Sequence, residues 1–205
     1  MWTGFWTGTW IPLSKGSSCP DTAMDPLHII KKYYVPDSSL YRILVDHSRQ
    51  VTRKSLGIAR NLAHLAPDLE FIEKAAMLHD IGIFMTRAES IGCTGELPYI
   101  CHGYLGRKLL DDQGLDPAFG LVAERHTGAG ITLDNIVRGN LPLPKRDMVP
   151  VSLEERIICC ADKFFSKNPR HRDKKMTVPV IVEELAKINP GHAARFAGWA
   201  EALRL

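Results

Sequence analysis

Residues 71–82 read FIEKAAMLHDIG, an apolar helical stretch that runs into a histidine and an aspartate. Apolar side chains recur at helical spacing from Phe71 to Leu78 and predict the inner face of a helix, with His79 continuing that face. Asp80 is the next residue, and adjacent residues on a helix lie about 100° apart. Both side chains can therefore serve one centre only if they straddle it.

Punctuating residues on both sides set the limits of this helix. Pro67-Asp68 predicts its start and Gly82 predicts its end. Upstream, Asp25-Pro26 predicts a short helix that runs through Ile30. Pro36-Asp37-Ser38 predicts the start of a longer helix that runs on toward Leu62. One face of this longer helix carries residues at three- and four-residue steps, namely Leu40, Ile43, Leu44, His47 and Val51.

The rest of the chain also has helical patterning. Pro98 is expected to begin a helix that carries His102, and Asp116-Pro117 one that carries His126. Residues 128–150 are expected to form a long loop rich in Pro, which could act as a lid. A capping box at 152–155 precedes a helix from Ile157 to Phe165 that carries Asp162, and two more helices are expected near 180–188 and 192–203. No strand-like alternation of useful length occurs, so the expected fold class is all-α, a compact helical bundle.

The composition is that of an ordinary globular protein. The chain has 205 residues, 45% of them hydrophobic and 24% charged, and its net charge of +3 is too weak to favour binding of long nucleic acids. Five cysteines without a CxxC pair indicate a reducing, cytoplasmic compartment, and no apolar run is long enough to span a membrane. Residues 1–23 are rich in Trp, Gly and Thr and are expected to form an irregular extension, which could be translated sequence upstream of a natural start at Met24. Residues 24–205 are expected to form a single domain.

Six polar residues fall at inward-facing positions among apolar neighbours: His47, His79, Asp80, His102, His126 and Asp162. Any one of them alone is more simply explained as a hydrogen-bonded core residue. Six together in a small domain need a shared explanation, because buried polar groups are costly without partners. A metal centre provides it, since imidazole and carboxylate are ligands for Fe, Mn, Zn and similar ions.

The ordered set His47, His79-Asp80 and Asp162 resembles the HD-domain superfamily of metal-dependent phosphohydrolases, and residues 79–82 resemble the HDIG form of its signature. The resemblance covers Leu40 to Phe165. It implies that these four residues bind one metal ion. Two intervening histidines, His102 and His126, resemble the subgroup that holds a second ion, with Asp80 as the catalytic bridge between the two.

This resemblance also implies a mechanism and a set of cofactors. Two metal ions about 3.5–4 Å apart can share a water and lower its pKa toward neutrality for attack on phosphorus. Fe or Mn is expected first, and Mg, Zn, Ni or Co would also suit the ligands. Lys163 is the first candidate to bind the substrate phosphate and Arg125 the second. Weaker candidates are Arg87, Arg107 and the loop pair Lys145-Arg146.

The expected function is hydrolysis of a phosphoester or phosphoanhydride bond in a small, nucleotide-type substrate, by a protein that could be a homodimer. An alternative is a mixed-valent diiron oxygenase, because some relatives in the superfamily use the same six ligands to activate oxygen. A non-catalytic sensor that keeps its metals is a third reading. The ligand types alone do not separate these three functions.

Overall fold

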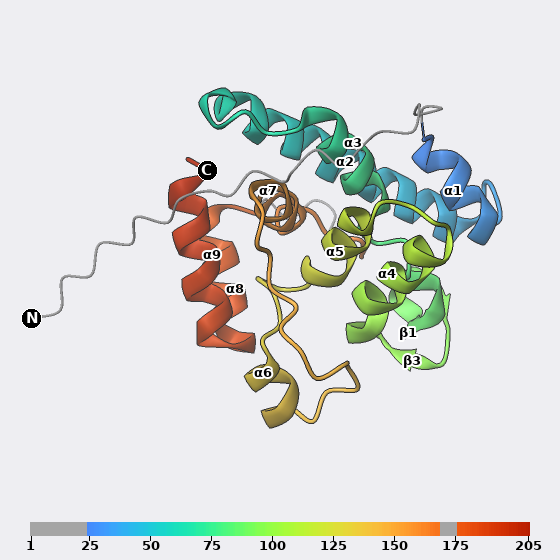
Figure 1. Cartoon of the computed structure of the whole chain (residues 1–205). Helices are drawn as coiled ribbons and strands as arrows, with labels where there is room; N and C mark the ends of the chain where they lie inside the picture. Colours follow the sequence, from blue (N-terminus) through green and yellow to red (C-terminus); the bar gives the residue numbers. More distant parts are fainter. Residues whose placement is uncertain (1–23, 169–175) are drawn as a thin grey trace, which may run out of the picture.

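The computed structural model describes residues 24–168 and 176–205. The predicted irregular extension, residues 1–23, lies outside the described residues. Helices dominate the described chain (Figure 1), which confirms the predicted all-α class. Helix α7 lies among the other helices, with the α8–α9 pair on one side and α1 on the other.

The first three helices begin at the residues that the sequence predicts. Helix α1 spans Pro26–Tyr33, α2 spans Ser39–Asn61 and α3 spans Leu69–Leu78. Each is preceded by a residue whose side-chain oxygen accepts a hydrogen bond from a first-turn N–H, as an N-cap does. These caps are Asp25, Ser38 and Asp68. A short 3-10 turn, Ala63–Leu65, joins α2 to α3.

Helix α3 ends earlier than predicted, which changes how the two neighbouring ligands are presented. It ends at Leu78 rather than at Gly82, so His79 is its C-cap and Asp80 lies in the turn that follows. The hydroxyl of Tyr34, at the end of α1, donates a 2.7 Å hydrogen bond to the Ile81 carbonyl of this turn. His79 and Asp80 are therefore presented by the end of α3 and the turn that follows it, not by the body of a helix.

Gly82 allows the turn to lie directly against α4. A Cβ atom at Gly82 would be 2.3 Å from the His102 carbonyl oxygen and 2.5 Å from the Gly106 nitrogen. Both are backbone atoms, so a side chain has no room at this position. The glycine therefore brings the turn after α3 and the start of α4 together.

A small sheet that the sequence did not predict follows the turn. It contains β1 (Thr86–Ala88), β2 (Cys93–Thr94) and β3 (Leu97–Pro98) in the order β2-β1-β3. The central strand β1 is antiparallel to β2 and parallel to β3. Strands this short cannot show an alternating pattern. Three 3-10 turns accompany them: Ile83–Met85, Glu89–Ile91 and Tyr99–Cys101. The helix predicted from Pro98 accordingly begins later, as α4, His102–Asp112.

The middle of the chain contains one helix more than expected. Helix α5 spans Pro117–Arg125, as predicted from its cap. The predicted loop over residues 128–150 was partly wrong, because α6 (Leu133–Arg138) lies within it. Thr132 and Asn135 form a reciprocal capping box at its start. That Thr-x-x-Asn spacing was the available signal, and the helix is short enough to be obscured by the surrounding prolines.

The last three helices complete the bundle. Helix α7 spans Leu153–Asp162 and ends three residues before the predicted Phe165. Ser152 caps it, but Glu155 does not close the predicted box, because its carboxylate accepts from the Val151 N–H instead. Helices α8 (Val178–Ile188) and α9 (Pro190–Ala202) pack on each other near their predicted places.

Buried apolar residues of α2, α3, α5 and α7 pack with those of α8 and α9 in one cluster, and a second cluster joins α1 to α3 and α4. Adjacent Cys159 and Cys160 are both buried free thiols, and Cys160 belongs to the first of these clusters. Along the described ranges, no helix combines the length and apolar character that a membrane crossing requires.

We expect Gly82→Ala to lower the free energy of unfolding by roughly 2–4 kcal/mol, because its Cβ would collide with the backbone of α4. Gly57→Ala is the matched control. Gly57 is exposed within α2 and has open space around it, so alanine should raise stability by about 0.5–1 kcal/mol. Urea denaturation measures both values, and equal effects of the two substitutions would contradict the close approach.

Candidate metal centre

The structure brings the six predicted ligands together from five parts of the chain, and all six are buried. His47 comes from the middle of α2 and Asp162 from the last residue of α7. The other four lie at the ends of elements: His79 and Asp80 after α3, His102 at the start of α4, and His126 after α5. They form two clusters that share Asp80.

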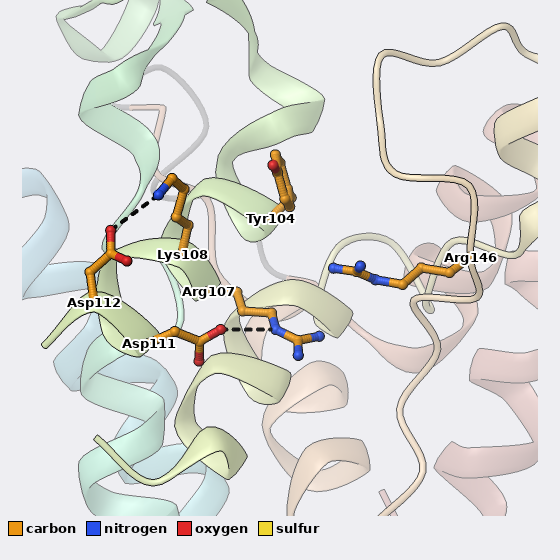
Figure 2. A pocket seen from close by; sticks show the side chains of 6 residues that line it. All are labelled: Tyr104, Arg107, Lys108, Asp111, Asp112 and Arg146. Atoms are coloured by element: carbon orange, nitrogen blue, oxygen red, sulfur yellow. Dashed lines mark hydrogen bonds and ion pairs between the residues drawn. The ribbon is translucent and has the colours of Figure 1, made fainter. Parts of the chain in front are cut away.

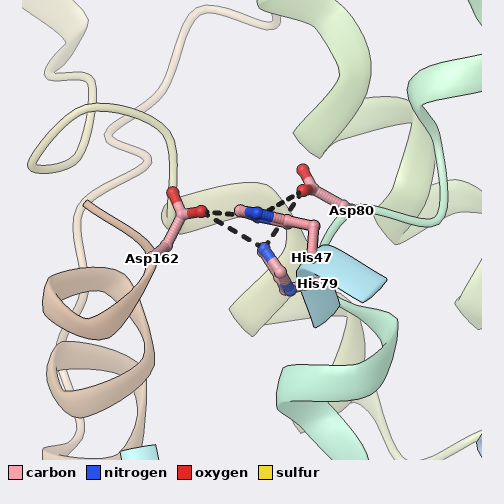
Figure 3. Close-up of side chains that lie close together, drawn as sticks. All are labelled: His47, His79, Asp80 and Asp162. Atoms are coloured by element: carbon pink, nitrogen blue, oxygen red, sulfur yellow. Dashed lines mark hydrogen bonds and ion pairs between the residues drawn. The ribbon is translucent and has the colours of Figure 1, made fainter. Parts of the chain in front are cut away.

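The first cluster contains His47, His79, Asp80 and Asp162, whose side chains point toward one another (Figure 3). His47 Nε2 lies 3.2 Å from Asp80 Oδ2 and 2.9 Å from Asp162 Oδ1. His79 Nε2 lies 3.1 Å and 3.6 Å from the same two oxygens. Ligand atoms bound at about 2.0–2.2 Å to one ion lie roughly 3–3.5 Å apart, so these four atoms fit around a single cation.

The second cluster uses the other oxygen of Asp80. Oδ1 lies 3.4 Å from His102 Nε2 and 3.2 Å from His126 Nε2, and the two imidazole nitrogens are 3.0 Å apart. The carboxylate thus offers Oδ2 to the first cluster and Oδ1 to the second. This is the arrangement of a carboxylate that bridges two ions.

Three of the four histidines are oriented in the same way by their own helices. Each imidazole Nδ1 donates to the backbone carbonyl three residues earlier, since a carbonyl can only accept. The pairs and distances are His79–Ala76 (2.7 Å), His102–Tyr99 (2.6 Å) and His126–Ala123 (2.8 Å). His79 and His126 follow α3 and α5, whose last carbonyls lack a partner within the helix, whereas the Tyr99 carbonyl also accepts the backbone N–H of His102. The Nδ1 bond leaves the Nε2 lone pair free to face the cluster.

The donor set has the features expected of a metal site. His79 Nε2 and Asp80 Oδ1 are buried without a hydrogen-bond partner among the described residues. The Nε2 atoms of His102 and His126 face each other at 3.0 Å, although each nitrogen presents a lone pair. Such contacts are unfavourable unless a positive charge lies between them. The residues therefore fit divalent metal ions at both clusters.

The first cluster is strongly polarised. Burial opposes ionisation of Asp80, but Lys167 and His79 outweigh it and hold the pKa of Asp80 well below its usual range. Burial likewise opposes ionisation of Asp162, where Lys163 and Lys167 lower the pKa. Burial disfavours the charged form of His79, yet the two carboxylates raise its pKa to about 9. Two ionised carboxylates in the interior attract positive charge to this cluster.

The histidines of the second cluster remain neutral. Burial and the neighbouring His126 lower the pKa of His102 to about 3, and burial also lowers the pKa of His126. A neutral imidazole is the form that binds a metal ion. The second cluster thus offers two lone pairs and one carboxylate oxygen.

The two predicted substrate-binding cations lie in different surroundings. Lys163 Nζ is 2.6 Å from Asp162 Oδ2, the oxygen that faces away from the His47 contact, so it adjoins the first cluster. Arg125 makes a two-oxygen contact with Glu155 at 3.0–3.1 Å. Substrate binding by these two residues stays a prediction.

A third cation, which sequence reasoning missed, also contacts the first cluster. Lys167 Nζ is 2.6 Å from Asp80 Oδ2 and 3.3 Å from His47 Nε2. The residue follows α7 in a segment without regular structure, so no helical spacing marked it. Its position five residues after Asp162 was the only available signal.

The weaker candidates Arg107 and Arg146 line a separate pocket of about 300 Å³ (Figure 2). Both guanidinium groups pair with Glu124, whose side chain is 1% exposed. Arg107 also pairs with Asp111. A buried carboxylate between two arginines ties the loop that carries Arg146 to α4 and α5.

The glycine loop after His126, residues 128–130, is anchored by side chains of α9. Gly128 has a φ of +63°, and a Cβ there would lie 2.7 Å from His192 Nδ1. Arg195 donates from Nε to the Ala129 carbonyl at 2.8 Å and from its terminal nitrogen to the Gly130 carbonyl at 2.7 Å. Helix α9 thereby fixes the backbone that leads away from the second cluster.

Residues 44–166 match the HD domain family, which is more than half of the chain. The chain belongs to the HD domain family. This confirms the resemblance that the ordered histidines and aspartates predict. The matched segment of the HD domain contains all six residues of the two clusters.

Among curated relatives, this HD domain is 39% identical over 97 residues to an uncharacterized protein of Methanocaldococcus jannaschii, covering 47% of this chain and 50% of that protein. Two further relatives are named tRNA (cytidine(56)-2'-O)-methyltransferase. The one from Thermoplasma volcanium is 29% identical over 161 residues, 78% of this chain and 40% of the relative. The one from Picrophilus torridus is 30% identical over 146 residues, 64% of this chain and 39% of the relative. The chain spans half or less of the length of these relatives.

Two solved structures of the HD domain of the L. monocytogenes phosphodiesterase PgpH are similar. The one in complex with cyclic-di-AMP has a TM-score of 0.50 at 14% identity and covers 90% of this chain and 97% of that one. The other has a TM-score of 0.49 at 13% identity and covers 85% and 95%. At 14% identity, the similarity to the structure with cyclic-di-AMP supports the HD-domain fold of this chain and nothing further.

We expect reconstituted protein to contain close to two transition-metal ions per chain, because each cluster presents a complete face of ligand atoms. His102→Ala combined with His126→Ala should leave about one ion. His64→Ala, an exposed histidine of the 3-10 turn after α2, should retain two. Elemental analysis by mass spectrometry gives the ratio, and one ion or none in the wild-type protein would contradict the dinuclear site.

Proposed function

We propose that this HD domain is a metal-dependent phosphohydrolase that cleaves a phosphoester or phosphoanhydride bond of a nucleotide-like substrate. The observation that carries the proposal is the single buried carboxylate, Asp80, that offers one oxygen to each of two ligand clusters. Membership of the HD domain family supports the same reaction class. The proposal assigns metal binding to the six clustered residues and treats residues 24–205 as one domain.

Two bound ions would supply a water of lowered pKa and a positive charge for the phosphoryl oxygens. The protein's own part is to fix the ligands before substrate binds. Asp80 holds the two centres in register, and the carbonyls of Tyr99 and Ala123 hold the His102 and His126 rings in place. Thr127 Oγ1 lies 3.5 Å from His102 Nε2 and is suitably placed to contact a substrate oxygen.

Positive side chains in contact with the first cluster favour an anionic substrate. Lys163 and Lys167 both contact its carboxylates, at 2.6 Å each. An ammonium group is a suitable partner for a phosphoryl oxygen. We therefore retain Lys163 as a proposed substrate contact, whereas the pairing of Arg125 with Glu155 favours a structural role for that arginine.

The relatives guide the choice of nucleotide. A fold neighbour was solved with cyclic-di-AMP, and two relatives carry the name of a tRNA methyltransferase. This chain covers only 40% and 39% of those two enzymes, so methyl transfer does not carry over to it. The names favour testing nucleotides and RNA-terminal phosphates as substrates.

Diiron oxygen chemistry is the second candidate, because the same histidine and carboxylate set could serve it. The two reactions differ in their requirements. Hydrolysis releases phosphate or a phosphomonoester without oxygen and with redox-inert ions, whereas the oxygenase needs iron and consumes oxygen.

We expect Mn-loaded protein to hydrolyse at least one member of a panel of cyclic dinucleotides, nucleotides, dinucleoside polyphosphates and RNA-terminal phosphates in the absence of oxygen. Asp80→Asn should lower kcat/KM at least roughly 100-fold, because even residues that only orient metal ligands cost 10–100-fold. His64→Ala is the control and should keep wild-type rates. Product analysis by chromatography reads the result. Substrate-dependent oxygen consumption by iron-loaded protein would favour the oxygenase, and a metal-loaded protein that is inert in both assays would favour a sensor.

A further inference from the structure

Lys167 lies among the ligand atoms of the first cluster rather than at its edge. Its ammonium contacts Asp80 Oδ2 at 2.6 Å and His47 Nε2 at 3.3 Å, and Asp162 Oδ1 is 3.9 Å away. The Lys167 side chain is only 14% exposed, so these contacts replace most of the water around the charge.

The three ligand atoms that Lys167 approaches are the ones that the first cluster would offer to a metal ion. An ion bound to Asp80 Oδ2 at about 2.0–2.2 Å would stand beside an ammonium that lies 2.6 Å from the same oxygen. The ammonium and the metal ion would then be two positive charges in contact with the same oxygen atom, and such charges repel strongly in a buried site. The lysine and the ion therefore cannot both keep this carboxylate.

A lysine is suited to move away without disturbing the fold. Its four-carbon side chain is flexible, and Lys167 follows α7 in a segment without regular structure. An ammonium that has lost its carboxylate partner needs another anion near the same site. A phosphoryl group that approaches the first cluster would provide one.

We propose that Lys167 gives up Asp80 when a divalent ion binds the first cluster, and that its released ammonium then binds an anionic oxygen of the phosphorylated substrate. Lys167 is thus a substrate-binding residue that becomes available only after metal has bound. This inference rests on the proposed function and adds an order of binding, metal before substrate.

The first test is metal affinity without any substrate. Lys167→Met keeps the length and removes the charge, so Mn²⁺ should bind the first cluster at least 5-fold more tightly when titrated against a chelating dye. Lys54→Met is the charge-matched control. Lys54 is half-buried with its ammonium over the Phe164 ring, and its removal should leave the affinity within 2-fold. Unchanged or weaker Mn²⁺ binding by Lys167→Met would overturn the competition.

The second test uses inorganic phosphate as the probe on Mn-loaded protein. Calorimetry should show phosphate binding at least 5-fold weaker in Lys167→Met than in the wild-type protein, with Lys167→Arg close to wild type and Lys54→Met unchanged. Equal phosphate affinity in Lys167→Met and the wild-type protein would overturn the second half of the proposal.

A third measurement needs no variant and so stands even if Lys167→Met fails to fold. An amine-reactive reagent followed by peptide mass spectrometry should label Lys167 weakly in metal-stripped protein, strongly with Mn²⁺, and weakly again with Mn²⁺ and phosphate. Lys108, 59% exposed, is the internal reference and should stay constant. Constant labelling of Lys167 in a protein that binds two ions would overturn this inference alone, whereas a protein that binds no metal would overturn the proposed function as well.

Discussion

The structure depends on one electrostatic constraint: two ionised carboxylates, Asp80 and Asp162, share the interior with four imidazoles. Removing carboxylates from water is costly unless positive charge is brought to them. The chain supplies part of that charge through Lys163 and Lys167. Among the described residues, no lysine or arginine contacts the facing nitrogens of His102 and His126. The helices therefore converge on two buried clusters whose carboxylates and imidazoles favour bound cations.

The way the histidines are held explains why so much of the fold consists of helix ends that converge. His79 and His126 lie just past the last residues of α3 and α5, and His102 lies at the end of a 3-10 turn. His79 and His126 use carbonyls that their own helices leave without a partner, whereas His102 uses the Tyr99 carbonyl, which also accepts the His102 backbone N–H. The same bond that finishes the helix aims Nε2 at the centre. Local helix termination and ligand orientation are thus one event.

The sequence was informative where side-chain chemistry follows helical spacing. The buried positions of His47 and Asp162 were predictable because these residues share a face with apolar neighbours, and capping residues located most helix starts. The sequence was less informative where structure depends on long-range contact. The turn that frees Asp80 from α3 is held by Tyr34 and by the close approach of α4 at Gly82. Lys167 carries no pattern at all, because its partner is distant in sequence and its segment is irregular.

Two anchors of the site come from outside the segment that matches the HD domain family. Tyr34 precedes that segment and bonds to the turn after α3, while His192 and Arg195 follow it and hold the glycine loop beside His126. A protein engineer who grafted residues 44–166 alone onto another chain would carry every ligand and lose these supports. The portable unit of this domain is larger than its recognisable signature, and it extends from α1 to α9.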